Sequence, residues 1–255
     1  MNDLAGKTIL LTGASKGIGA ATARALGAAG ANLIAHYGSD RAGAEDAVAA
    51  IPAARKLLLK ADLADDRAID SMWRDALAWR GQIDVVVNNA ATMLWNGGLD
   101  ADDETWSRVW RETLQINVLA PARIMRAAVR HYREQGGGIL VTISSWAAQR
   151  GTSIPDTIAY AASKAAIRAA TQTIARGYAK ENILAYVLAP GVVRTQMSEA
   201  SAATLGGEAA VNATLAMGEW VPPEDIAQLV AFLATGRCRH LTGATLDVNG
   251  ASYVR

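Results

Sequence analysis

The fold is decided by the stretch Thr8-Ile9-Leu10-Leu11-Thr12-Gly13-Ala14-Ser15-Lys16-Gly17-Ile18-Gly19. Its apolar start predicts a buried strand over 8–12, and the glycine-rich turn leads into a predicted helix over 19–29, with Gly30 as its stop. Glycine lets the backbone turn sharply and lets a phosphate approach without a Cβ in the way. The N-terminus of the helix then offers free N–H groups and a positive dipole end. The stretch therefore predicts a phosphate-binding turn, although its glycine spacing is not the usual dinucleotide pattern and a tightly packed turn is the alternative.

The same alternation of apolar segments and helices continues along the chain. Further strands are predicted over 32–36, 57–60, 84–88, 139–143, 184–188 and 245–248, and helices over 65–79, 105–135 (two helices or one bent helix), 157–180 and 223–235. Continuous apolar strands that alternate with helices predict a parallel sheet covered on both faces. We expect an α/β, doubly wound (Rossmann) three-layer fold with a seven-stranded parallel sheet. It forms one domain over 1–255, with a substrate flap at about 192–221.

Composition excludes several classes of protein. The 25 basic and 24 acidic residues nearly cancel, which argues against a nucleic-acid binder. The one cysteine, Cys238, cannot form an internal disulfide, and no metal site is predicted because the three histidines show no metal-ligand spacing. No segment approaches the roughly 18 apolar residues of a membrane span, and the N-terminus does not resemble a secretory signal. We expect a cytoplasmic protein without membrane or nucleic-acid partners.

A second pattern lies in Tyr160-Ala161-Ala162-Ser163-Lys164, inside an alanine-rich predicted helix. A spacing of four residues places Tyr160 and Lys164 on one face of the helix. A nearby ammonium favours the phenolate, so we expect the pKa of Tyr160 to be lowered and the phenol to exchange protons near neutral pH. The pair alone is weak evidence for a catalytic site, because this spacing also occurs by chance.

Together the motifs resemble those of the short-chain dehydrogenase/reductase family. They are Thr12-Gly13-x-x-x-Gly17-x-Gly19, Asn88-Asn89-Ala90, a serine ahead of the tyrosine, Tyr160-x-x-x-Lys164 and Pro190-Gly191. The resemblance implies that Tyr160 exchanges a proton with the substrate, that Lys164 holds the nicotinamide ribose, and that Ser145 rather than Ser144 polarises the carbonyl. It also implies that Asn117 interrupts a helix and holds a water for proton transfer. The gap between Ser145 and Tyr160 is slightly longer than is usual in the family, which predicts an enlarged loop over 149–156.

The end of the second predicted strand usually distinguishes the two nicotinamide cofactors. Tyr37 stands where NAD-preferring relatives carry an aspartate, and Lys16, Ser39 and Arg41 can hold a 2′-phosphate. NADP(H) is therefore preferred, and NAD(H) is the alternative if Asp40 binds the ribose hydroxyls instead. The resemblance places Asp62 and Leu63 at the adenine. It assigns the other cofactor contacts to Gly13, Ser15, Gly17, Ile18, Gly19, Asn89, Ala90, Pro190, Gly191, Val193 and Thr195.

The resemblance points to an NADP(H)-dependent oxidoreductase that acts on a carbonyl or secondary alcohol, similar to 3-oxoacyl-carrier-protein reductases. An NAD(H)-dependent alcohol, polyol or sugar dehydrogenase is the alternative, and a non-catalytic dinucleotide-sensing protein is a third hypothesis. Trp95, Trp146 and Trp220 are predicted to line the substrate pocket. Without an obvious arginine for a carboxylate, a small neutral and partly apolar substrate is expected. Relatives of this kind assemble as homotetramers, and the same is expected here.

Overall fold

The computed structural model describes residues 3–254. Within them, seven strands form one parallel sheet in the order β3-β2-β1-β4-β5-β6-β7. The strands are β1 Thr8–Leu11, β2 Asn32–Tyr37, β3 Lys56–Lys60, β4 Val85–Asn88, β5 Gly138–Ile143, β6 Ile183–Pro190 and β7 Thr245–Val248. This confirms the predicted doubly wound fold. The order changes direction between β1 and β4, which places a crevice above the carboxyl ends of these two strands.

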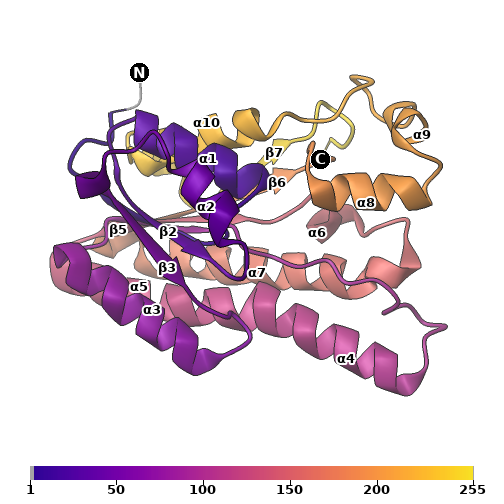
Figure 1. Ribbon diagram of the computed structural model, residues 1–255, viewed down its shortest axis with the longest axis horizontal. Coiled ribbons are helices and arrows are strands. Elements are labelled where there is room, and N and C mark those ends of the chain that lie inside the picture. The colour runs from indigo at the N-terminus through magenta and orange to yellow at the C-terminus, as the bar shows by residue number, and fades with distance from the viewer. Residues whose placement is uncertain (1–2, 255) are drawn as a thin grey trace.

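Helices cover both faces of the sheet (Figure 1). The helices are α1 Gly17–Ala28, α2 Arg41–Ala47, α3 Asp66–Arg80, α4 Asp103–Leu114, α5 Ala120–Gln135, α6 Ala147–Arg150, α7 Ile158–Tyr178, α8 Gln196–Thr204, α9 Glu208–Asn212 and α10 Pro223–Ala234. The neighbours α1 and α10 lie on one face with α2, whereas α3, α4, α5 and α7 lie on the other (Figure 1). Between residues 3 and 254, no helix is both long and apolar enough to span a bilayer.

Alternation along each strand divides the core into two apolar layers. In β1, Ile9 and Leu11 pack with α1 and α10, whereas Leu10 packs with α3, α5 and α7. All three side chains are fully buried. Because both faces of the sheet are covered, the strands read as continuous apolar runs, and this explains why they could be predicted from the sequence.

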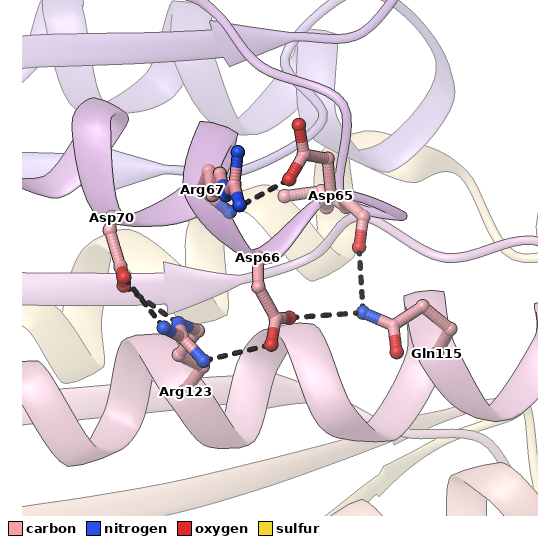
Figure 2. A network of polar contacts seen from close by, with 7 residues as sticks. Asp65, Asp66, Arg67, Asp70, Gln115 and Arg123 are labelled. Carbon is pink, nitrogen blue, oxygen red and sulfur yellow. Dashed lines mark hydrogen bonds and ion pairs between the residues drawn. The ribbon is translucent and has the colours of Figure 1, made fainter.

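A polar network ties α3 to the segment that connects α4 and α5 (Figure 2). Arg123 of α5 forms ion pairs with Asp66 at 2.9 Å and with Asp70 at 2.6 Å. Gln115 donates hydrogen bonds to the Asp66 carboxylate and to the carbonyl of Leu63, both at 3.4 Å. The groups are exposed, so their main effect is to set the position of Gln115 rather than to add much stability.

The stretch predicted over 105–135 forms two helices, α4 and α5, and the interruption expected at Asn117 is the π-helical segment η2 (Gln115–Leu119) between them. Short helices α2 and α6 were not predicted, because each has too few apolar residues for a clear period. The irregular stretch at 192–221 contains α8 and α9, and a β-bridge between Val193 and Val221 pairs its two ends.

Candidate active site

Hydrogen bonds join the turns that follow β1 and β4. The Oγ1 of Thr12 donates to the carbonyl of Val87 at 3.3 Å and accepts from the backbone N–H groups of Asn89 and Ala90, at 3.0 and 3.1 Å. The Nδ2 of Asn89 donates to the carbonyls of Thr12 and Gly13, at 2.9 and 3.0 Å. The two turns are thereby fixed to each other at the point where the strand order reverses.

A buried histidine holds the same turn from the other side. The Nδ1 of His36 accepts a hydrogen bond from the N–H of Gly13 at 3.1 Å, and its Nε2 lies 3.1 Å from the carbonyl of Ala61. This pair of partners requires a neutral ring with the proton on Nε2. Burial lowers the pKa of His36 below its ordinary value, which favours that neutral form, although the bond to Ala61 opposes the shift. The sequence indicated only strand packing for this residue.

Glycine is required where the turn meets α1. A Cβ on Gly19 would lie 1.8 Å from the carbonyl oxygen of Gly13 and 2.7 Å from the Nδ2 of Asn89. Gly13 and Gly17 both have φ in the left-handed region, at 70° and 53°. No side chain caps the N-terminus of α1, so its first N–H groups are left for an anion. These features fit the pyrophosphate of a dinucleotide.

A cavity of about 570 Å³ lies above this turn. Its walls come from the loops at the carboxyl ends of the strands, and Trp95 adds an aromatic surface. The predicted site residues that it brings together are Gly13, Ser15, Lys16, Gly17, Ile18, Gly19, Ser39, Asn89, Ala90, Ser145, Tyr160, Lys164, Pro190, Gly191, Val193 and Thr195. Three further residues that line the cavity were not predicted: Thr92 and Met93, which follow the Asn89-Ala90 pair after one alanine, and Met197 on α8.

Five predicted residues do not line this cavity: Tyr37, Arg41, Asp62, Leu63 and Asn117. Tyr37 and Leu63 are buried, with 7% of their surface exposed. Arg41 is ion-paired with Glu45 at 2.7 Å. Asp62 accepts a hydrogen bond from the N–H of Ala64 and so stabilises the turn ahead of α3.

Asp40 has a structural role at the start of α2. Its Oδ1 accepts a hydrogen bond from the N–H of Gly43 at 2.9 Å, which makes it the N-cap of the helix. Its backbone carbonyl accepts a hydrogen bond from the Oγ of Ser15 at 2.6 Å, so the cap is also tied to the glycine-rich turn. One of the two carboxylate oxygens of Asp40 is therefore already used by the protein.

The Tyr160–Lys164 pair lies at the cavity wall on α7. The Nζ of Lys164 is 5.7 Å from the centroid of the Tyr160 ring and donates a hydrogen bond to the carbonyl of Ile143 at 2.8 Å. Burial lowers the pKa of Lys164 to about 8. Burial also raises the pKa of Tyr160, and a hydrogen bond with Ser145 opposes this shift only in part. The expected lowering of the Tyr160 pKa is thus wrong for this structure, because desolvation of the phenolate outweighs the hydrogen bond with Ser145.

The two adjacent serines have different surroundings. The Oγ of Ser144 donates a hydrogen bond to the backbone carbonyl of Lys164 at 2.9 Å, which anchors β5 to α7. The Oγ of Ser145 accepts from the N–H of Ala147 at 3.1 Å and is hydrogen-bonded to Tyr160. Ser145 therefore retains a hydroxyl proton that it can direct toward Tyr160 or a ligand.

Asn117 occupies the π-helical segment and is almost fully buried. Its Oδ1 accepts from the N–H of Thr92 and its Nδ2 donates to the carbonyl of Thr92, both at 2.8 Å. The Nδ2 also donates to the Oγ of Ser163 at 3.0 Å, and that hydroxyl donates to the carbonyl of Tyr160 at 2.7 Å. Asn117 thus connects the loop after β4 to the backbone of the helix that carries Tyr160.

A second cavity, of about 190 Å³, adjoins the first and shares Ser145 and Tyr160 with it. Trp146 lines this second cavity, as expected for a pocket residue. The expectation for Trp220 is wrong, because this side chain is 3% exposed and packs with Ala202, Val211 and Leu215 within the flap. The sequence showed where Trp220 stands in the chain but not which way it faces.

Comparison with known proteins gives matches over nearly the whole chain. A family model described as "Enoyl-(Acyl carrier protein) reductase" matches residues 13–251. The chain is 34% identical to 3beta-hydroxysteroid dehydrogenase 1 of Eggerthella lenta, over 98% of this chain and 94% of that protein. It is 32% identical to the 3-oxoacyl-[acyl-carrier-protein] reductase FabG of Escherichia coli, over 98% of each chain. A solved 3-ketoacyl-(acyl-carrier-protein) reductase from Brucella melitensis, complexed with NADH, superposes with a TM-score of 0.86 at 25% identity, over 99% of this chain and 100% of that chain.

The glycine cradle yields a first prediction. Gly19→Ala should weaken the binding of a nicotinamide dinucleotide by at least about 10-fold, because the new methyl group forces the Gly13 carbonyl and the Asn89 side chain apart. Gly177→Ala in α7 is the matched control, since a Cβ there meets nothing within 4 Å and the residue lines neither cavity. Fluorescence titration measures both. Equal affinities for the two variants would contradict the assignment of this turn.

The histidine yields a second prediction. Because the pKa of His36 in the folded protein lies below the ordinary histidine value of 6.5, the unfolded chain takes up the proton first as the pH falls. The contribution of neutral His36 is therefore present above about pH 6.5 and is lost as the pH falls through its folded pKa. His36→Asn keeps an acceptor for Gly13 but does not titrate. Urea midpoints should fall less steeply between about pH 7 and 5 in the variant than in the wild type, and parallel profiles would refute this role.

Proposed function

This chain belongs to the short-chain dehydrogenase/reductase family, whose members act on CH–OH or C=O groups, and we propose that it is an NADP(H)-dependent carbonyl reductase. The observation that carries the proposal is the single cavity in which the glycine-rich turn, Ser145, Tyr160 and Lys164 meet. A nicotinamide cofactor bound there supplies the hydride. The protein binds the cofactor and the substrate, orients them and supplies the proton.

The phosphate end of the cavity is built to hold the cofactor. The uncapped N-terminus of α1 faces it, and Thr195 from the loop after β6 lies against Gly17, where a Cβ would be 2.9 Å from its Cγ2. Pro190 and Gly191 extend this wall toward Tyr160. The loops after β1 and β6 would thus hold the pyrophosphate and the nicotinamide from two sides.

The proton chemistry supports reduction of a carbonyl. Because burial raises the pKa of Tyr160, the side chain stays a phenol at neutral pH and can donate its proton as the carbonyl oxygen gains negative charge. Ser145, hydrogen-bonded to Tyr160, would donate a second hydrogen bond to that oxygen. Lys164, with a pKa of about 8, remains mostly charged and favours the phenolate that is left behind.

The preference for NADP(H) rests on the end of β2. A buried tyrosine, Tyr37, stands where a carboxylate would bind the ribose hydroxyls. Asp40 is committed in part to capping α2. Lys16 and Ser39 line the cavity, and their ammonium and hydroxyl groups can bind a 2′-phosphate. An NAD(H)-dependent alcohol dehydrogenase remains the alternative, through the second carboxylate oxygen of Asp40.

Two substitutions test the chemistry. Tyr160→Phe should lower kcat by at least about 100-fold, because the proton donor is lost, while the NADPH dissociation constant stays within about 3-fold. Ser145→Ala should lower kcat by about 10- to 100-fold through the lost oxyanion hydrogen bond. Ser144→Ala is the matched control and should lose far less activity, with any effect appearing as reduced thermal stability. Turnover is measured on aldehydes, ketones, 3-oxoacyl thioesters and sugars, and a protein that binds cofactor but converts none of them would support the sensing hypothesis.

The cofactor preference is tested by titration with NADPH and NADH. NADPH should bind more tightly than NADH. Lys16→Met should weaken NADPH binding by about 10-fold and leave NADH binding within about 2-fold, because it removes the ammonium that binds the 2′-phosphate, a group that NADH lacks. Tighter binding of NADH to the wild type would overturn the preference in favour of the alternative.

A further inference from the structure

The second cavity contains a charged group that the sequence did not indicate. Among the described residues that line it, Arg150 at the end of α6 is the one charged side chain. The other walls are apolar side chains and small hydroxyl residues, with Met93, Ile154 and Val192 among the apolar ones. A lone cation in an otherwise uncharged pocket, next to a proton donor, is a candidate determinant of specificity.

Two aromatic rings lie against the exposed side chain of Arg150. Its Cζ lies 4.8 Å from the centroid of the Trp146 ring and 5.9 Å from that of Tyr253. Such stacking uses the face of the guanidinium and leaves the N–H groups at its edge free for a planar anion. No carboxylate side chain within residues 3–254 forms an ion pair with Arg150.

The segment that carries Arg150 is held in place on both sides. The neighbouring Gln149 donates a hydrogen bond to Asp247 of β7 at 3.0 Å. After the turn at Gly151, whose φ is 75°, the N–H of Ile154 donates to the Oγ1 of Thr152 at 3.1 Å. This is the enlarged stretch between Ser145 and Tyr160, and these contacts make it a defined wall of the pocket.

We infer that Arg150 binds a carboxylate of the substrate, so that the substrates are small oxo acids and the products the corresponding hydroxy acids. The carbonyl lies at Ser145 and Tyr160, which both cavities share, and the carboxylate lies at Arg150. The volume of about 190 Å³ is below the roughly 300 Å³ at which pockets for larger ligands begin, and this favours a short chain. The inference rests on the proposed reductase function and replaces the neutral substrate expected from the sequence.

The reaction balances without a further reagent. The reduced cofactor gives a hydride to the carbonyl carbon and is itself oxidised by two electrons. The C=O π bond breaks, Tyr160 gives a proton to the oxygen, and solvent later restores the phenol. The carboxylate is unchanged, so Arg150 contributes binding and orientation only.

The test compares the oxo acids acetoacetate and levulinate with their methyl esters, which are neutral but otherwise similar. Arg150→Met should lower kcat/KM for the acids by about 10- to 100-fold, mainly through KM, and leave the esters within about 2-fold. Arg150→Lys, which keeps the charge but not the planar fork, should restore part of the loss. Arg80→Met is the matched control, because Arg80 also stacks on a tryptophan, at 4.5 Å from Trp79, but lies outside both cavities.

Binding is measured separately from turnover. Levulinate should change the tryptophan fluorescence of the NADPH-loaded Tyr160→Phe variant in a saturable manner, and adding Arg150→Met should abolish the change. Equal losses for acids and esters, or no levulinate binding, would overturn the inference. Wild-type protein that reduces the esters but not the acids would overturn it and leave the reductase function intact. Failure to reduce any carbonyl in the wider panel would instead contradict the proposed reductase function on which the inference rests.

Discussion

The hydrogen-bonded junction between Thr12 and Asn89 is the constraint on which the site depends. It joins the turn after β1 to the turn after β4 where the strand order reverses, and His36 holds the same turn from β2. Because this junction is fixed, the glycine-rich turn cannot move relative to the loops that follow β4. The cavity beside it is therefore largely formed by the protein alone, which lowers the ordering cost of binding.

Burial has opposite effects on the two ionisable groups of the site. It raises the pKa of the phenol of Tyr160 and lowers that of the ammonium of Lys164, because in each case the charged form is disfavoured. The two pKa values, which are close to each other in free side chains, are thereby moved apart, so that Tyr160 stays a phenol at neutral pH while Lys164 begins to lose its proton at about pH 8. Asn117 and Ser144 act indirectly, by positioning α7. Ser144 donates to the backbone carbonyl of Lys164, and Asn117 donates to the hydroxyl of Ser163, which in turn donates to the carbonyl of Tyr160.

Much of the fold could be predicted, because both faces of the sheet are covered and each strand reads as an apolar run. The helix predicted over 105–135 was correct in extent, but its π-helical segment depends on hydrogen bonds that Asn117 makes with residues distant in the sequence. Sixteen of the predicted residues meet in one cavity, since motifs at strand ends converge at one edge of a parallel sheet. Burial could not be read from the sequence. Burial changed the direction of the Tyr160 pKa shift, and it removed the Trp220 side chain from the substrate pocket. The position of the exposed Arg150 side chain at the second cavity was equally absent from the sequence.

The central claim is that one cavity holds a nicotinamide cofactor beside the phenol of Tyr160. A crystal structure with NADPH bound tests this most directly, because it requires no knowledge of the substrate. The account predicts the pyrophosphate at the N-terminus of α1 and the nicotinamide ring between Tyr160 and the Pro190–Gly191 segment. Density for the nicotinamide on another face of the protein, or remote from the Tyr160 hydroxyl, would contradict it.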